Sequence, residues 1–317
     1  MNTCSGVARR AIPALILGLP ALARAQGWPP RPLVVATTAM VAELARGIGG
    51  EEFAVETLMG EGVDPHLYRP TRADLARLLR ADLILCNGLR LEGRMGDVLE
   101  RAAATRPVIA VAEIIPPARR RAHPEYPDAP DPHLWMDPLL WAECAAPVAA
   151  ALARLRPGFD TAPGLAALRG RLEEFAAYAR RAFEPLPAER RLLVTAHDAF
   201  GYFGQRFGME LASIQGLSTE AEASLARIES LVALLVERRV PAVFPETSVP
   251  DRAVRALIEG AGARGHRVAL GGALFSDSLG RPGTYRGTYE GMLDHNITTI
   301  ARALGGDAPE RGLRGQL

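Results

Sequence analysis

The chain has 317 residues, with 37 basic and 36 acidic side chains and a formal charge of +1 at pH 7. A near-neutral chain without a stripe of basic residues is a poor candidate for nucleic-acid binding, so we expect no nucleic-acid partner. Its hydrophobic share of 48% is enough for one large or two medium domains with buried cores.

The first 25 residues have the pattern of a secretory signal peptide. Arg9-Arg10 precedes an apolar run over residues 11–23, and Ala23-Arg24-Ala25 fits the small-residue cleavage motif. The run is too short to span a bilayer, and Cys4 precedes it, which is the wrong place for the acylated cysteine of a lipoprotein. We therefore expect cleavage near Ala25 and export to the periplasm. The arginine pair is a weak indication of the twin-arginine route.

We expect no second apolar stretch of the mature chain to be long enough to span a membrane. The mature protein is therefore expected to be soluble. Its two cysteines are Cys86 and Cys144. An oxidising compartment allows them to pair, but two isolated cysteines are more typical of small buried hydrophobic side chains.

The first half of the mature chain alternates short apolar runs with helical patterns. Thr71 and Asp74, three residues apart, indicate a helix start close to a capping box. Such alternation is typical of βαβ units and a parallel sheet. We expect strands at residues 32–38, 54–59, 81–87 and 108–112, and helices at 40–46, 71–79 and 92–104.

A second series repeats this pattern, and a long helix is expected between the two. Residues 164–183 have apolar positions at helical spacing with no strand on either side. We expect an α/β protein with two Rossmann-like lobes, the first over residues 26–157 and the second over 188–317, joined by one long rigid helix within 158–187. In the second lobe, strands are expected at 192–195, 210–215, 242–245 and 267–270, and helices at 220–238, 252–260 and 285–303.

The tetrapeptide Asp-Pro-His-Leu occurs twice, at residues 64–67 and 131–134, in a chain with six histidines. Proline fixes its own φ and restricts the residue before it, so each histidine leaves a stiff, non-helical corner. An imidazole held in such a corner loses little further entropy, which suits a metal ligand. The alternative is a repeated turn with a surface histidine, and the tetrapeptide alone favours neither.

Four polar residues follow predicted strands or lie in corners beyond them. In open α/β sheets ligands bind beyond the carboxyl ends of the strands, so two facing lobes would bring the four together. Three imidazoles and one carboxylate suit a borderline divalent cation, zinc above all, with manganese or iron as alternatives. Because imidazoles bind metal in their deprotonated form, we expect the metal affinity to fall as the pH drops below the histidine pKa. The four residues are His66, His133, His197 and Asp277.

Each position also has a simpler explanation. His66 and His133 are alternatively turn caps, and His197 is alternatively the cap of a following helix. Asp277 is alternatively part of an Asx turn. Glu246 ends a predicted strand. There it either orients a ligand residue without contacting the metal itself, or satisfies local backbone groups. The remaining histidines, expected outside the site, are His123, His266 and His295.

Longer segments around these positions resemble a known family. They are GVDPHLY at 62–68, ADLI at 81–84 with NGL at 87–89, DPHLWMDP at 131–138, TAHDAFGYF at 195–203, QGLSTE at 215–220, SDSLG at 276–280, and GTY at 287–289 with Met292 and His295-Asn296. Together, over about residues 33–304, they resemble the TroA/ZnuA-like (cluster A-I) solute-binding proteins of zinc and manganese ABC transporters. No single segment is as specific as the set.

The resemblance implies two α/β lobes joined by a rigid helix, with metal at their interface and the four residues above as its ligands. Members limited to manganese often carry glutamate at the third position, whereas His197 fits the three-histidine set. Many zinc importers insert a long histidine-rich loop before the second ligand, whereas residues 116–130 contain only His123. Ligand softness favours zinc over manganese.

The expected function is a periplasmic protein, not an enzyme, that captures one divalent cation and delivers it to the membrane permease of an ABC importer. We expect a monomer. A secreted metal-dependent hydrolase is the rival interpretation, but a catalytic zinc usually keeps an open position and the chain lacks an H-E-x-x-H motif. A metal chaperone or adhesin on the same fold is a third, because fold does not fix function.

Overall fold

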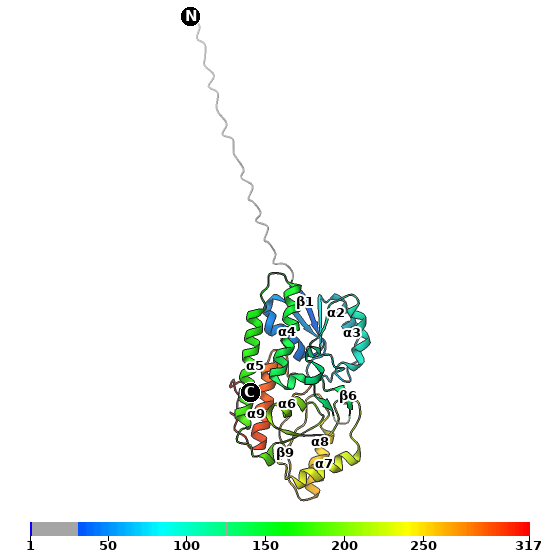
Figure 1. Ribbon diagram of the computed structural model, residues 1–317, viewed down its shortest axis with the longest axis vertical. Helices are drawn as coiled ribbons and strands as arrows, with labels where there is room; N and C mark the ends of the chain where they lie inside the picture. Colours follow the sequence, from blue (N-terminus) through cyan, green and yellow to red (C-terminus); the bar gives the residue numbers. More distant parts are fainter. Residues whose placement is uncertain (2–30, 124–125) are drawn as a thin grey trace. The chain divides into compact units, whose positions relative to one another are not determined.

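The computed structural model describes Met1 and residues 31–123 and 126–317 (Figure 1). The predicted signal peptide and its cleavage site at Ala25 lie outside the described residues. The predicted α/β class with parallel sheets is confirmed, because the strands of both halves pair in parallel.

The first half is built on a parallel sheet of four strands in the order β2-β1-β3-β4. Adjacent residues of a strand point to opposite faces. Val34 thus belongs to the core shared with the helices α1 and α4 (Pro138–Leu155), whereas Val35 packs with Leu78 of α2 and Leu99 of α3. The elements are β1 (Leu33–Ala36), α1 (Ala39–Gly49), β2 (Ala54–Thr57), α2 (Arg72–Arg80), β3 (Leu83–Cys86), α3 (Gly96–Ala103) and β4 (Val108–Ala110).

The second half repeats the parallel arrangement with shorter strands. The strand β7 pairs with β8, β9 pairs with β10, and a bridge between Thr195 and Phe244 connects the two pairs. The strand β7 has the predicted bounds, whereas the other three predicted strands of this half are present but shorter than expected. The elements are β7 (Leu192–Thr195), α6 (Gly201–Phe207), β8 (Glu210–Ser213), α7 (Leu225–Glu237), β9 (Ala242–Val243), α8 (Arg252–Ala263), β10 (Ala269–Leu270) and α9 (Tyr289–Leu304).

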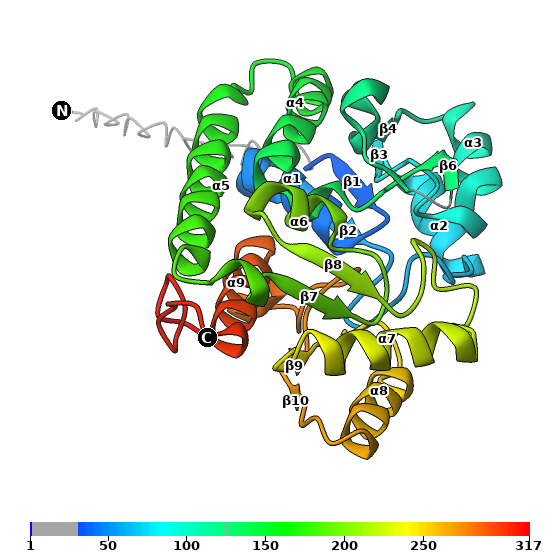
Figure 2. The ribbon, with the colours of Figure 1, turned by 60° about the horizontal axis from the view of Figure 1, so that its bottom comes forward.

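A long helix, α5 (Ala162–Phe183), lies between the two series, where the apolar spacing predicts it. It packs against α1 and α4 from the first half and against α9 from the second, as Figure 2 shows. One hydrophobic core contains side chains of both halves, for example Val34 and Leu304. The halves are therefore joined by shared packing as well as by the helix.

The helix α4 (Pro138–Leu155) was not predicted, and it corrects the expectation about apolar stretches. With 18 residues and a mean hydropathy of 1.2, it is long and apolar enough to cross a membrane. Its buried residues, Trp141 and Val148 among them, instead pack in the shared core against α1 and α5. Its apolar positions are spread around the axis, so the amphipathic pattern that reveals a surface helix is weak.

Two loops also differ from expectation. An antiparallel hairpin, β5 (Ala122–His123) and β6 (Tyr126–Pro130), lies within the proline-rich segment that precedes His133. The helix expected over 220–238 begins only at Leu225, because Ser224 caps it through the backbone N–H of Arg227. Residues 214–224 therefore form a long connection between β8 and α7. Cys86 and Cys144 are both free and buried.

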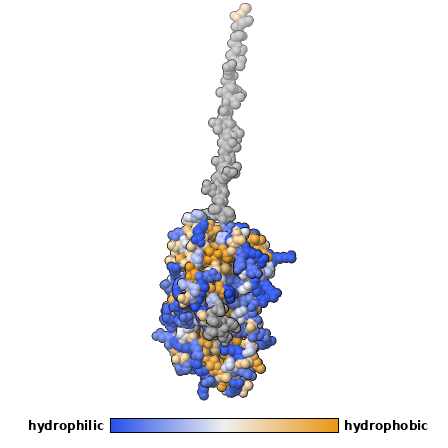
Figure 3. All heavy atoms as spheres, turned by 45° about the vertical axis from the view of Figure 1, so that its right-hand side comes forward, coloured by the Kyte–Doolittle hydropathy of each residue, from blue (hydrophilic) through white to orange (hydrophobic). Residues whose placement is uncertain are grey.

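Hydrophilic and hydrophobic side chains occupy different parts of one face of the described body. On the face in Figure 3, hydrophilic side chains occupy most of both margins, and hydrophobic ones gather toward the middle. Large hydrophobic residues with substantial exposure include Leu67 at 43% and Leu225 at 74%.

The capping box predicted at Thr71 and Asp74 is confirmed, and it yields a stability prediction. Asp74 accepts hydrogen bonds from the Thr71 backbone N–H (2.8 Å) and from the Tyr68 hydroxyl (2.6 Å). Burial raises the pKa of Asp74, but these hydrogen bonds outweigh it and leave the pKa below its usual value. Asp74→Ala should lower the free energy of unfolding by about 1 kcal/mol at pH 7, measured by urea denaturation.

The difference should depend on pH in one direction. Because the folded pKa lies below the unfolded value of about 3.9, the contribution is complete above that pH and is lost as pH falls through the folded pKa. Asp97→Ala, which removes an exposed acid from the first turn of α3, is the matched control and should change stability by less than about 0.5 kcal/mol. Equal losses in the two variants would contradict the capping explanation.

Candidate metal centre

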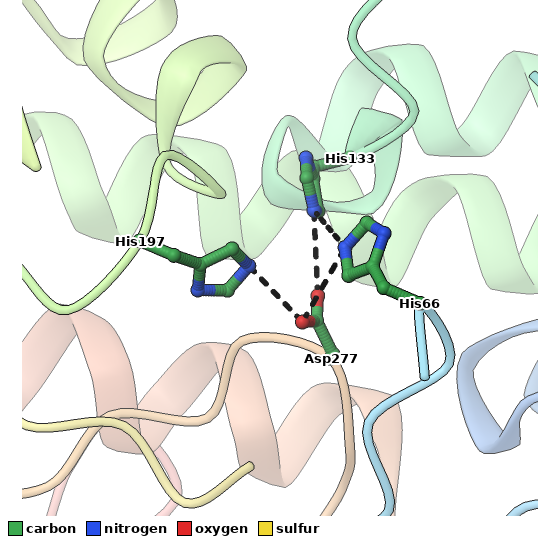
Figure 4. Close-up of side chains that lie close together, drawn as sticks. All are labelled: His66, His133, His197 and Asp277. Atoms are coloured by element: carbon green, nitrogen blue, oxygen red, sulfur yellow. Dashed lines mark hydrogen bonds and ion pairs between the residues drawn. The ribbon is translucent and has the colours of Figure 1, made fainter. Parts of the chain in front are cut away.

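The four candidate side chains come from four loops. His66 follows β2, His133 follows β6, and His197 lies two residues beyond the end of β7. Asp277 lies in the connection between β10 and α9. Figure 4 shows the three imidazoles and the carboxylate pointing toward one another.

Their ligand atoms all lie within 4.8 Å of one another. The Nε2 atoms of His66 and His133 are 3.3 Å apart. Asp277 Oδ2 lies 3.0 Å from His197 Nε2 and 3.8 Å from His66 Nε2, and Asp277 Oδ1 lies 3.5 Å from His133 Nε2. Metal–nitrogen bonds of about 2.0–2.1 Å in a tetrahedron would put ligand atoms about 3.3 Å apart. The spacing therefore fits one shared cation.

The cluster is buried, and three of its polar atoms have no hydrogen-bond partner among the described residues. His133 and His197 are 0% exposed, Asp277 3% and His66 6%. Despite the 3.0 Å contact, His197 Nε2 and Asp277 Oδ2 do not meet hydrogen-bond geometry, and no described residue bonds either of them or Asp277 Oδ1. Buried polar atoms without partners are costly, so such a group needs an explanation. A cation at the point that these atoms face would satisfy all of them.

The two Asp-Pro-His corners have the same backbone arrangement. Asp64 and Asp131 each accept the backbone N–H of the histidine two residues later, in both cases at 2.9 Å. Asp131 Oδ1 also lies 2.7 Å from His133 Nδ1, and its Oδ2 pairs with Arg121 at 2.9 Å. The ring of His133 is therefore held with Nε2 toward the centre, as expected for a metal-binding imidazole.

Glu246 holds His197 in the second half much as Asp131 holds His133 in the first. One carboxylate oxygen accepts the backbone N–H of His197 at 2.9 Å, and the other lies 2.5 Å from its Nδ1. Glu246 therefore contacts both the backbone and the ring of His197, which fits both roles considered for it.

Burial and neighbouring charges shift the pKa values of His66, His197 and Asp277. Burial lowers the pKa of His66 to about 3, more than the opposing charge of Asp277 raises it. Burial also lowers the pKa of His197, but the negative charges of Glu246 and Asp277 outweigh it and hold the pKa well above its usual value. Burial raises the pKa of Asp277, and the charge of His197 reverses this, leaving it well below its usual value. His66 is therefore neutral, whereas His197 is paired with two carboxylates.

Several residues around the cluster were not expected from the sequence. Arg121 lies against Asp131 and, at 3.3 Å, against Asp198, so one guanidinium contacts both halves. The ring centroids of Trp135 and His133 lie 5.2 Å apart. The indole N–H of Trp135 donates a hydrogen bond to the Ser276 carbonyl at 2.8 Å. Trp135 and Asp131 lie within the segment at 131–138, and the composition of that segment is the sequence feature that could have identified them.

The other histidines take no part in the cluster where they are described. His266 Nε2 lies 2.8 Å from the Val240 carbonyl, and His295 Nε2 lies 2.8 Å from the Ala273 carbonyl. Each imidazole therefore has a hydrogen-bond partner outside the cluster. The side chain of His123 lies outside the part of the chain that the structure describes.

Comparison with known proteins matches the chain over nearly all of its described length. A family model described as zinc-uptake complex component A, periplasmic, matches residues 34–303. The zinc-binding protein TroA of Treponema pallidum (strain Nichols) is 45% identical over 276 residues, which cover 86% of this chain and 89% of the relative. The manganese-binding lipoprotein MntA of Bacillus subtilis (strain 168) is 41% identical over 273 residues, which cover 86% and 89%.

Solved structures agree with this match. The periplasmic zinc-binding protein TroA from Treponema pallidum superposes with a TM-score of 0.84 at 45% identity, covering 86% of this chain and 99% of that one. The Fe(III)-bound YtgA of Chlamydia trachomatis superposes with a TM-score of 0.78 at 25% identity, covering 88% and 100%. The chain belongs to the zinc-uptake complex component A family, whose members are periplasmic metal-binding components of transporters and not enzymes.

Proposed function

We propose that the chain captures one divalent cation between its two halves and delivers it to the membrane permease of an ABC importer. The observation that carries this proposal is the convergence of four buried ligand groups, in which His197 Nε2 and both Asp277 carboxylate oxygens have no hydrogen-bond partner among the described residues. His66 and His133 would supply two ligands from the first half, and His197 and Asp277 two from the second. Family membership supports the transport role.

Zinc is the proposed cation, with manganese as the main competitor. Three imidazole nitrogens and one carboxylate form a borderline ligand set that zinc accepts in tetrahedral geometry, whereas manganese prefers more oxygen ligands. The names of relatives point both ways, because TroA is described as zinc-binding and MntA as manganese-binding. We further propose that the mature protein acts as a monomer in the periplasm after removal of residues 1–25.

Metal titration of the metal-free mature protein tests the proposed function. We expect isothermal titration calorimetry to give one zinc per chain and zinc to displace bound manganese in competition. Glu259→Gln, an exposed change on α8, should leave the titration unchanged. A wild-type protein that stays metal-free with either cation would contradict the proposal, and preferential binding of manganese would contradict only the choice of metal.

Glu246→Gln should weaken zinc binding about 10- to 100-fold, the usual effect of removing an outer partner of a metal-binding histidine. An amide keeps the shape of the side chain but replaces the carboxylate that lies 2.5 Å from His197 Nδ1. The ring of His197 would then lose both its orientation and part of its basicity. Competition with a chromophoric chelator measures the affinity, with Glu259→Gln as the control. Wild-type affinity in Glu246→Gln would show that Glu246 serves the backbone alone.

A further inference from the structure

The two Asp-Pro-His corners differ in what binds the second carboxylate oxygen. In the His133 corner, Asp131 Oδ2 pairs with Arg121, and Oδ1 also contacts the imidazole. In the His66 corner, Asp64 Oδ2 instead accepts the hydroxyl of Thr219 at 2.5 Å, across 155 residues of sequence. The position of the His66 corner therefore depends on a residue of the second half.

Thr219 lies on the long connection between β8 and α7, and it is 8% exposed. Its neighbour Glu220 forms an exposed ion pair of 3.2 Å with Arg94 of the first half. Such an exposed pair contributes little, whereas a partly buried hydrogen bond to a carboxylate is among the stronger ones. The Thr219 hydroxyl is therefore the main link from this connection to the His66 corner.

His66 is also the ligand nearest to solvent. It is 6% exposed, whereas His133 and His197 are 0% exposed. The backbone N–H of His66 is held by Asp64 Oδ1, and Asp64 is held in turn by Thr219. A change that frees Asp64 would let this corner move while the partners of His133 and His197 stay in place.

We propose that Thr219 is a positioning residue that holds the His66 corner closed over the bound cation and so slows its release. This inference rests on the proposed function, because it assumes that His66 is a ligand. The hydroxyl of Thr219 donates to Asp64, which is not a candidate ligand, so Thr219 acts through Asp64. A second bond, from the Gly62 N–H to Ser278 Oγ at 3.1 Å, ties the start of the same loop to the second half, so the effect of losing Thr219 is partial.

Cation dissociation rates test this role. Thr219→Val keeps the shape of the side chain without the hydroxyl and should release zinc about tenfold faster than wild type, as expected for loss of one hydrogen bond to a charged group. Thr219→Ser keeps the hydroxyl and should stay within about twofold of wild type. Stopped-flow mixing of the zinc-loaded mature protein with a chromophoric chelator gives the rates. Thr219→Ala is the second variant, and calorimetry should give one zinc per chain in every variant.

Glu220→Gln is the matched control, since it weakens the neighbouring exposed contact with Arg94. It should change the release rate by less than about twofold. Release from Thr219→Val at the wild-type rate, or equally fast release from Thr219→Ser, would overturn the role of the hydroxyl. A wild-type protein that binds no cation would instead contradict the proposed function, so the two failures are distinguishable.

Discussion

His197→Ala is expected to lower zinc affinity by more than about 100-fold, since removing even an outer partner of a metal-binding histidine costs about 10- to 100-fold. The variant loses a proposed ligand, and it leaves Glu246 and Asp277 facing each other across the vacated volume. Thermal unfolding also reports the loss. At a zinc concentration a thousand times the wild-type dissociation constant, wild type should gain about 4 kcal/mol, and the variant should gain no more than about 1.4 kcal/mol.

The control and a second variant separate ligand loss from misfolding. His266→Ala removes a half-buried histidine outside the cluster and should bind zinc like wild type. Removing one partner of a buried ion pair costs about 3–5 kcal/mol, so His197→Ala should unfold more easily without metal. His66→Ala avoids this cost because His66 is neutral, and it should still lose most of the affinity. Wild-type binding by either cluster variant would remove that histidine from the proposed ligand set.

Trp135→Ala is expected to lower the free energy of unfolding of the metal-free protein by about 3–5 kcal/mol, the usual cost of a large cavity. Trp135 is fully buried and packs edge-on against both His133 and Trp141. Its indole N–H donates to Ser276, and its carbonyl accepts the Tyr289 hydroxyl at 2.5 Å. Both partners belong to the second half, so the variant should weaken the contact between the halves. Urea denaturation measures the change.

A pair of phenylalanine variants isolates the hydrogen bond from the packing. Trp135→Phe removes the donor to Ser276 and leaves a buried carbonyl unpaired, which adds about 1–3 kcal/mol to the packing cost. Trp141→Phe is the matched control, because among the described residues the Trp141 indole N–H has no hydrogen-bond partner. Trp135→Phe should therefore be the more destabilising of the two. Equal losses would show that the bond to Ser276 contributes nothing to stability.

Elements with a strong local pattern were predictable. Parallel strands rich in branched apolar residues, such as Leu192–Thr195, occur where alternation predicts them, and the capping box at Thr71 follows from spacing alone. The helix α4 was missed because a helix buried on several sides loses the periodicity that distinguishes helix from other apolar segments. The late start of α7 was missed because the polar and small residues before Ser224 resemble a continuing helix.

By itself, the sequence determined the α/β class, the stiff Asp-Pro-His corners and the four residues worth testing as ligands. Those properties depend on local backbone preference and on side-chain chemistry, both of which act over a few residues. Only the tertiary structure decided that the ligand atoms of these residues lie buried within 4.8 Å of one another, with no hydrogen-bond partner among the described residues for His197 Nε2 or the Asp277 oxygens. It also decided that two similar corners are held differently, one by Arg121 from its own half and one by Thr219 from the other. Such partners are separated by up to 155 residues, and their contact depends on how whole elements pack, which no local pattern encodes.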